Sequence, residues 1–269
     1  MKAVEGEVEI NGITIYYRSY GDGDPLLLIQ GLGANSDWWG DRFLEPLAEH
    51  FRVVTFDNRG AGRSGKPPGP YSIVEMASDT AELINHLGWD STNVAGLSMG
   101  GMIAQELALD YPEKVRKLVL MCTTSGGREQ TLADPEIYSI LNAPRQGISD
   151  EYIARIGLNL LFPIEFINEN PDLMDQLVHD MCIAPTPPEP FQAQVQAVSR
   201  WSVYDRISEL KNPTLIFSGE KDILIPPGNS RILHDLIPGS RLIEVSGAGH
   251  GLPSMCPEKI SSEIIDFLL

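Results

Sequence analysis

The stretch that most constrains the fold is Gly96-Leu97-Ser98-Met99-Gly100, a serine between glycines where a predicted strand meets a predicted helix. Residues 92–95 form a short apolar strand pattern, and residues 99–111 carry apolar side chains at helical spacing up to Pro112. So sharp a turn strains the serine backbone and brings neighbouring chain close, which favours glycine on both sides. The pattern predicts a nucleophile elbow that exposes the Ser98 hydroxyl at the carboxyl end of a sheet.

A second glycine-rich turn, Gln30-Gly31-Leu32-Gly33, directly follows the uninterrupted apolar run of residues 26–29. Such a run is typical of a strand covered on both faces. The glycines allow the backbone to approach a ligand, so we expect the backbone N–H groups of Leu32 and Met99 to form an oxyanion hole. A plain tight turn is the alternative.

The candidate base and acid also follow predicted strands. His250, among small residues, comes after the strand pattern of residues 241–245, and Asp222 comes after that of residues 213–218. Loops at the carboxyl ends of parallel strands open on one edge of the sheet, so these side chains are expected to meet Ser98 there. Histidine is suited to take the serine proton, and an acid is needed to orient it. Glu220 competes with Asp222 for that role.

The order of patterns predicts an α/β fold. An Asn11-Gly12 hairpin opens the chain, and strands alternate with helices up to Cys122 and again from Pro213, which favours a parallel sheet with right-handed crossovers. Between these parts, several helix starts and no convincing strand occur. We therefore predict a core domain of residues 1–127 and 205–269 and a helical cap domain of residues 128–204.

The loop of residues 57–65 is rich in glycine but has no lysine-serine pair and no direct entry into a helix, which argues against a nucleotide phosphate site. We expect Asp57 and Arg59 to pair and brace this loop. Ser72 and Glu75 form a capping-box pattern ahead of the next helix.

Composition limits the partners. The chain has 37 acidic and 20 basic residues and a formal charge of −17, which disfavours nucleic acid and anionic membranes. Three widely spaced cysteines indicate neither disulfides nor a zinc site, so we expect buried free thiols, no metal and no cofactor. The sequence has no apolar run of membrane-spanning length and no signal-peptide pattern at its amino terminus. We expect a cytoplasmic monomer or homodimer with a small-molecule substrate.

With Gly-Leu-Ser-Met-Gly at the elbow, Ser98, Asp222 and His250 in that order, and an insertion after Cys122, nearly the whole chain resembles the α/β-hydrolase superfamily. The resemblance is to its branch of serine esterases and 3-oxoadipate enol-lactonases. It implies a mostly parallel sheet flanked by helices, a helical cap after the sixth strand, and a triad of these three residues. Gln30 stands where many relatives have histidine.

The resemblance and the residues together favour a serine carboxylesterase that forms an acyl-enzyme on Ser98. Serine at the elbow argues against dehalogenases and epoxide hydrolases, which carry aspartate there. Enol-lactone hydrolysis in aromatic catabolism and carbon–carbon bond hydrolysis are alternatives, and a ligand-binding receptor on the same fold is the non-enzymatic one. Large apolar residues are expected to line the substrate pocket: Trp38, Trp39, Leu160, Leu161, Phe162, Phe166, Phe191 and Trp201.

Overall fold

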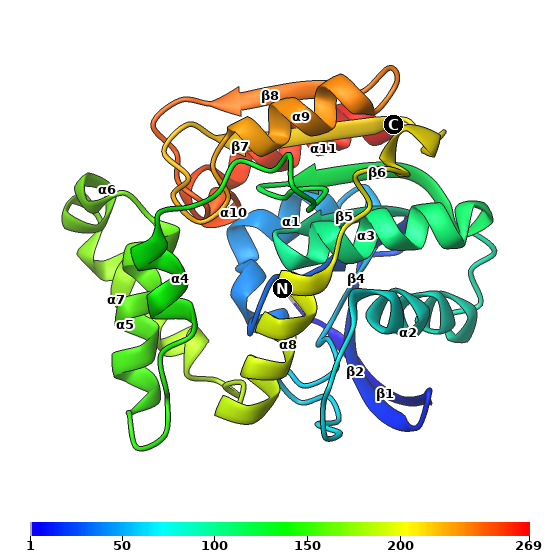
Figure 1. The fold of residues 1–269 in the computed structure, drawn as a ribbon. Coiled ribbons are helices and arrows are strands. Elements are labelled where there is room, and N and C mark those ends of the chain that lie inside the picture. The colour runs from blue at the N-terminus through cyan, green and yellow to red at the C-terminus, as the bar shows by residue number, and fades with distance from the viewer. Residues whose placement is uncertain (1) are drawn as a thin grey trace.

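The computed structural model describes residues 2–269, which form an eight-stranded sheet with helices on both faces (Figure 1). The strand order is β1-β2-β4-β3-β5-β6-β7-β8; β1 and β2 pair antiparallel, and all pairs from β4 to β8 are parallel. The strands are β1 Val4–Ile10, β2 Ile13–Tyr20, β3 Asp24–Ile29, β4 Phe51–Phe56, β5 Thr92–Leu97, β6 Val115–Met121, β7 Thr214–Gly219 and β8 Arg241–Val245. The predicted α/β class is confirmed.

The hairpin at the start of the chain has the expected turn. Asn11 and Gly12 both adopt positive φ, at 49° and 79°, and Ile10 pairs with Ile13. This geometry is that of a two-residue turn matched to the twist of the strands.

Two helical layers explain why the parallel strands are apolar throughout. On one face lie α2 Ile73–His86, α3 Met99–Asp110 and α9 Gly228–Leu236, and on the other lie α1 Asp41–Ala48 and α11 Pro257–Leu268. Leu27 and Ile29 of β3 pack in the first layer, whereas Leu26 and Leu28 pack in the second, and all four are fully buried. The strand is therefore covered on both faces, as predicted from its sequence.

The predicted helical insertion lies between β6 and β7. It consists of α4 Pro135–Leu141, α5 Asp150–Leu161, α6 Ile164–Glu169, α7 Pro171–Met181 and α8 Pro188–Arg200. Helices α4 to α7 gather at one side of the sheet, and α8 runs back toward it (Figure 1). Ala193 and Ala197 of α8 pack into the core beside α2 and α3. The separation into the two domains stated above stays a prediction.

The shorter elements are the 3₁₀ turns Ser36–Trp39, Pro112–Lys114 and Ile207–Glu209 and the helix α10 Leu252–Met255. Ser72 caps α2 by accepting the Glu75 N–H at 3.1 Å, which is one half of the predicted capping box, whereas the Glu75 side chain pairs with Arg59. None of the helices in residues 2–269 combines the length and the apolar character that crossing a membrane requires.

The predicted pairing of Asp57 with Arg59 is wrong. The Asp57 carboxylate is fully buried and accepts backbone N–H groups from Ser36 and Arg63, each at 2.7 Å. Arg59 turns instead toward α2, where it binds Asp79. Both side chains brace the loop of residues 57–65, but through separate partners, because the backbone donors already occupy the Asp57 oxygens.

Candidate active site

Ser98 lies on the strained strand-to-helix turn that the sequence predicts. Its backbone has φ 57° and ψ −120°, a conformation that non-glycine residues rarely adopt. A Cβ on Gly96 would lie 2.2 Å from the Gly100 carbonyl oxygen, and one on Gly100 would lie 2.0 Å from that of Ile29. Gly96 is therefore required by the close approach of the helix start, and Gly100 by the packing of the turn against β3.

Strand β6 and the loop after it hold the elbow in place. The Ser98 N–H donates to the Met121 carbonyl at 2.9 Å, and the Thr123 hydroxyl donates to the Ser98 carbonyl at 2.8 Å. Sequence analysis did not identify Thr123. Its position directly after the β6 pattern was the available signal, since that edge of the sheet also carries Ser98.

The predicted acid and base form a buried pair. The Asp222 Oδ2 atom lies 2.7 Å from Nδ1 of His250, and their side chains are 1% and 3% exposed. The other oxygen, Oδ1, accepts the N–H groups of Leu224 and Ile225 at 2.9 Å each. The two backbone N–H groups and the imidazole ring together fix the position of the carboxylate.

Glu220, the competing acid, points elsewhere. Its carboxylate accepts the Ser246 hydroxyl at 2.7 Å and the Gly247 N–H at 2.9 Å, and these bonds hold its pKa below the usual range. The side chain is exposed. Its oxygens serve a surface turn, so Asp222 is the carboxylate that orients His250.

Cys122 adds a third buried group beside this pair. Potential ligand atoms of Cys122, Asp222 and His250 all lie within 4.8 Å of one another. Burial, followed by the neighbouring carboxylate, raises the pKa of the Cys122 thiol well above its ordinary value, so the thiol is neutral. The Asp222 oxygens already contact two backbone N–H groups and the His250 ring. A metal would bind the thiolate form of Cys122, and this thiol is neutral. These residues therefore suit an acid–base pair better than a metal centre.

The glycine-rich turn after β3 approaches Ser98 as expected. A Cβ on Gly31 would lie 3.2 Å from Cβ of Ser98. Within residues 2–269 the backbone N–H groups of Leu32 and Met99 donate to no other atom of the chain, and both residues line the same cavity as Ser98. They are thus available to a developing oxyanion. Gln30 stabilises the turn through its side-chain oxygen, which accepts the Gly31 N–H at 2.9 Å.

A glutamine of the insertion secures the other end of this turn. Gln194 of α8 is fully buried; its oxygen accepts the Gly33 N–H at 2.8 Å, and its amide donates to the Arg59 carbonyl at 2.9 Å. Thr186 also donates to the Gly33 carbonyl, at 2.9 Å. The insertion therefore positions the candidate oxyanion hole as well as covering it. Sequence analysis missed Gln194, which had no local pattern to distinguish it.

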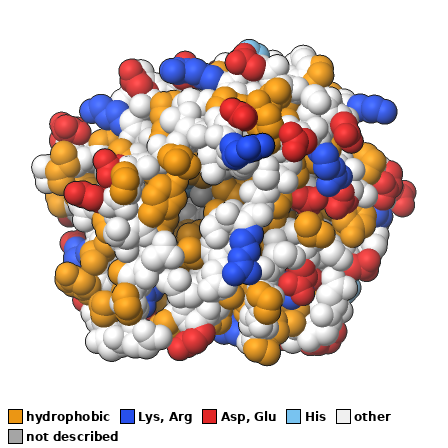
Figure 2. Space-filling model, viewed as in Figure 1, with side chains coloured by type: hydrophobic (Ala, Val, Ile, Leu, Met, Phe, Trp, Pro, Cys, Tyr) orange, Lys and Arg blue, Asp and Glu red, His pale blue; other side chains and the backbone are white. Residues whose placement is uncertain are grey.

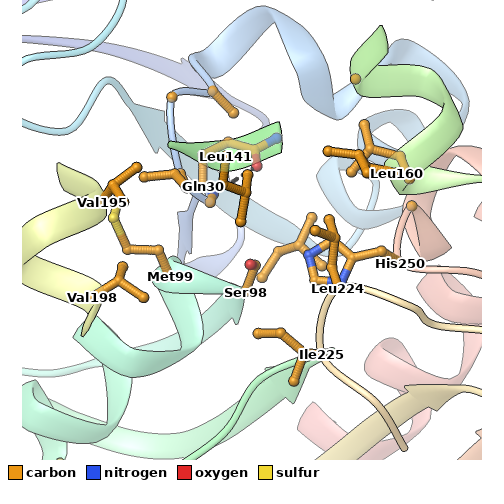
Figure 3. Close-up of a pocket in the computed structure, with 18 of the residues that line it drawn as sticks. Gln30, Ser98, Met99, Leu141, Leu160, Val195, Val198, Leu224, Ile225 and His250 are labelled. Carbon is orange, nitrogen blue, oxygen red and sulfur yellow. Dashed lines mark hydrogen bonds between the residues drawn. The ribbon is translucent and has the colours of Figure 1, made fainter. Parts of the chain in front are cut away.

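Ser98 and His250 open into a cavity of about 370 Å³ between the sheet edge and the insertion. Figure 2 shows a hollow near the middle of this face with hydrophobic side chains beside it. In Figure 3 the Ser98 hydroxyl points into the cavity, with the His250 ring on one side and Val195 and Val198 of α8 on the other. The volume falls in the range of small-molecule sites.

Seven of the eight residues predicted for the pocket line this cavity: Trp38, Trp39, Leu160, Leu161, Phe162, Phe191 and Trp201. Phe166 does not; its ring stacks on Phe162 at a centroid distance of 5.7 Å, within the small core of the insertion. Phe162 also explains a glycine beside the histidine, because a Cβ on Gly251 would lie 2.4 Å from its ring.

A strained serine, a buried carboxylate–imidazole pair and free backbone donors on one edge of a parallel sheet define the arrangement of an α/β hydrolase. A family model described as "alpha/beta hydrolase fold" matches residues 24–253, and the chain belongs to that family.

Its relatives cover almost the whole chain. It is 28% identical over 253 residues to the putative carbamate hydrolase RutD of Azorhizobium caulinodans, with 94% of each chain covered. It is 30% identical over 244 residues to the poly(3-hydroxyalkanoate) depolymerase of Ectopseudomonas oleovorans, with 91% of this chain and 84% of the relative covered. The crystal structure of the enol-lactonase from Burkholderia xenovorans LB400 superposes with a TM-score of 0.87 over 98% of this chain and 99% of that one, at 24% identity, and thus shares the fold.

Proposed function

We propose that the protein is a carboxylic ester hydrolase that works through an acyl-enzyme on Ser98. The observation that carries this proposal is the strained Ser98 elbow, which opens into the same cavity as a histidine bonded to a buried aspartate. A serine hydroxyl needs such a base to become a nucleophile, and the base needs an acid to fix its tautomer.

The proposed reaction has two halves. In the first, Nε2 of His250 takes the Ser98 proton as the hydroxyl oxygen attacks the ester carbonyl, and the Leu32 and Met99 N–H groups bind the oxyanion. The same proton then passes to the leaving alcohol, and the acyl group stays on Ser98. In the second half, His250 takes a proton from water, the resulting hydroxide attacks the acyl carbonyl, and the proton returns to the Ser98 oxygen as the acid leaves. Asp222 keeps Nδ1 protonated throughout.

The relatives support acyl transfer to water as the reaction class. A poly(3-hydroxyalkanoate) is a polyester, so that depolymerase cleaves an ester, and a carbamate is attacked at the same kind of carbonyl carbon. The apolar walls of the cavity suit the hydrocarbon part of an ester. Lactones and carbamates are therefore the first substrates to compare with open-chain esters, followed by substrates of carbon–carbon bond hydrolases.

The test is hydrolysis of 4-nitrophenyl esters of increasing chain length by the wild-type protein and by Ser98→Ala. The expected result is turnover that falls by about 10³-fold or more in the variant, with a fluorophosphonate probe labelling Ser98 alone. Ser139→Ala, an exposed hydroxyl on α4, is the matched control and should leave turnover unchanged. Labelling without turnover of any ester, lactone or carbamate would favour a binding role, and turnover that survives Ser98→Ala would refute the proposal.

A further inference from the structure

Arg145, in the turn between α4 and α5, is a half-buried cation without an anionic partner. It lines the cavity that contains Ser98 and also a neighbouring hollow of about 290 Å³ formed with residues 185–188. Within residues 2–269 its guanidinium forms no hydrogen bond and no ion pair. Its contact is the Phe191 ring, whose centre lies 3.3 Å from the guanidinium carbon.

Two other arginines whose side chains are largely removed from water, Arg59 and Arg18, are paired with carboxylates. Arg59 binds Asp79 through two nitrogens, and Arg18 binds Asp37. Arg145 lacks such a neighbour: burial alone lowers its pKa to about 10, with no acidic group raising it. The group is still charged at neutral pH, so its N–H donors are left for a partner outside the chain.

Phe191 connects this cation to the candidate oxyanion hole. A Cβ on Gly33 would lie 2.7 Å from the Phe191 ring, so the ring packs directly on the turn that carries Leu32. The ring itself is 3% exposed and forms a fixed support. A planar guanidinium stacked on it keeps the edge that bears its N–H groups free.

The charges elsewhere in the cavity do not neutralise Arg145. Asp150 and Asp180 also line the cavity, and the Asp180 carboxylate accepts the Gln176 amide at 2.8 Å. Neither forms an ion pair with Arg145. The formal charge of −17 repels anions at long range, so an anionic substrate requires a local cation of this kind.

We propose that Arg145 binds a carboxylate of the substrate while the ester or lactone carbonyl lies at Ser98. The substrate class is then a carboxylate-bearing ester or lactone, such as a monoester of a dicarboxylic acid. This inference rests on the proposed hydrolase function. A guanidinium suits this role because its parallel N–H groups match the two oxygens of a carboxylate.

The test compares two substrates that differ only in that carboxylate: mono-4-nitrophenyl adipate and its methyl-capped diester. The wild-type protein should favour the free carboxylate in kcat/KM. Arg145→Gln should lower kcat/KM for the carboxylate ester by about 10- to 100-fold and change that for the capped ester by less than about threefold. Arg145→Lys keeps the charge but loses the planar pair of donors, so its loss should be intermediate. Arg128→Gln removes the same charge from an exposed site and is the control.

Two results would overturn the proposal: a wild-type protein that does not favour the carboxylate ester, or an Arg145→Gln variant that slows both esters equally. Failure of the hydrolase function is recognised separately, as the absence of Ser98-dependent turnover of either ester. In that case calorimetry of adipate binding to Ser98→Ala decides the matter. Binding that weakens at least tenfold with Arg145→Gln upholds the carboxylate site, and binding that is absent or unchanged overturns it.

Discussion

Replacement of Asp222 by asparagine tests the proposed acid–base pair through the tautomer of His250. In the structure, Oδ1 of Asp222 faces the two backbone N–H groups of Leu224 and Ile225, and Oδ2 faces Nδ1 of the ring. An asparagine has one oxygen and one amide nitrogen. The oxygen belongs on the side of the two donors, which leaves the amide to donate to Nδ1 and forces the ring proton onto Nε2. Nε2 then cannot accept a proton from Ser98.

The magnitude follows from the two backbone bonds. Turning the amide over would restore the active tautomer, but it would leave the N–H groups of Leu224 and Ile225 without an acceptor, at a cost of about 1.5–3 kcal/mol each. The loss of about 3–6 kcal/mol leaves only about one molecule in 10² to 10⁴ in the turned state. We therefore expect kcat/KM to fall by about 10²- to 10⁴-fold while the protein remains folded.

The assay is kcat/KM for one short 4-nitrophenyl ester at about pH 7.5, with circular dichroism to verify the fold. Glu220→Gln is the matched control, because Glu220 is the neighbouring carboxylate that does not contact the ring. It should retain activity within about threefold. A kcat/KM of Asp222→Asn within about tenfold of the wild-type value would refute the reasoning, since it would show that the His250 ring does not depend on this carboxylate.

Three further predictions concern the support of the site. Gln194→Leu leaves the half-buried N–H of Gly33 without an acceptor and the buried Arg59 carbonyl without a donor. The free energy of unfolding should therefore fall by about 2–6 kcal/mol in a urea titration, and kcat should fall with it. Gly100→Ala places a Cβ 2.0 Å from the Ile29 oxygen and should destabilise the protein by about 3 kcal/mol or more in the same titration. The Cys122 thiol, buried and with a raised pKa, should resist iodoacetamide in the native protein and react after unfolding, as read by peptide mass.

Each of these predictions has a control within the chain. Gln192→Leu removes a half-buried amide that donates to the Leu141 carbonyl at 3.3 Å and should cost about 1 kcal/mol or less. Gly88→Ala introduces only backbone strain, since nothing lies within 4 Å of its Cβ, and should cost about 1–2 kcal/mol. Half-buried Cys182 is the reference thiol. The structure would be contradicted if Gln194→Leu or Gly100→Ala lost no more stability than its control variant. Equal alkylation of the Cys122 and Cys182 thiols in the native protein would contradict it as well.

The parts of the fold that sequence could predict are those fixed by local pattern. The strand at residues 241–245 agrees with the structure end to end, because an apolar run between breaking residues defines it. The Ser98 elbow was predictable for a related reason. Glycine on both sides of a serine between a strand and a helix has few uses other than a tight turn of this kind.

Residues whose roles depend on distant partners could not be found in this way. Gln194 and Arg145 lie in the insertion, more than a hundred positions from the turn at Gly33. In the sequence, a polar residue of the insertion looks the same as one that is exposed to solvent. The wrong pairing of Arg59 with Asp57 has the same cause, since Asp79 on α2 is a better placed acceptor. The prediction that Phe166 lines the pocket was wrong because apolar character alone does not distinguish a residue of the cavity wall from one in the core beneath it.

The most direct test of the central claim is the mass of the protein caught during turnover. The protein is mixed with a 4-nitrophenyl ester, quenched with acid within milliseconds, and mapped by peptide mass spectrometry. The account predicts an added acyl mass on the peptide that contains Ser98, absent from Ser98→Ala. Ester turnover with no acyl mass, or with the acyl group on another residue, would contradict it.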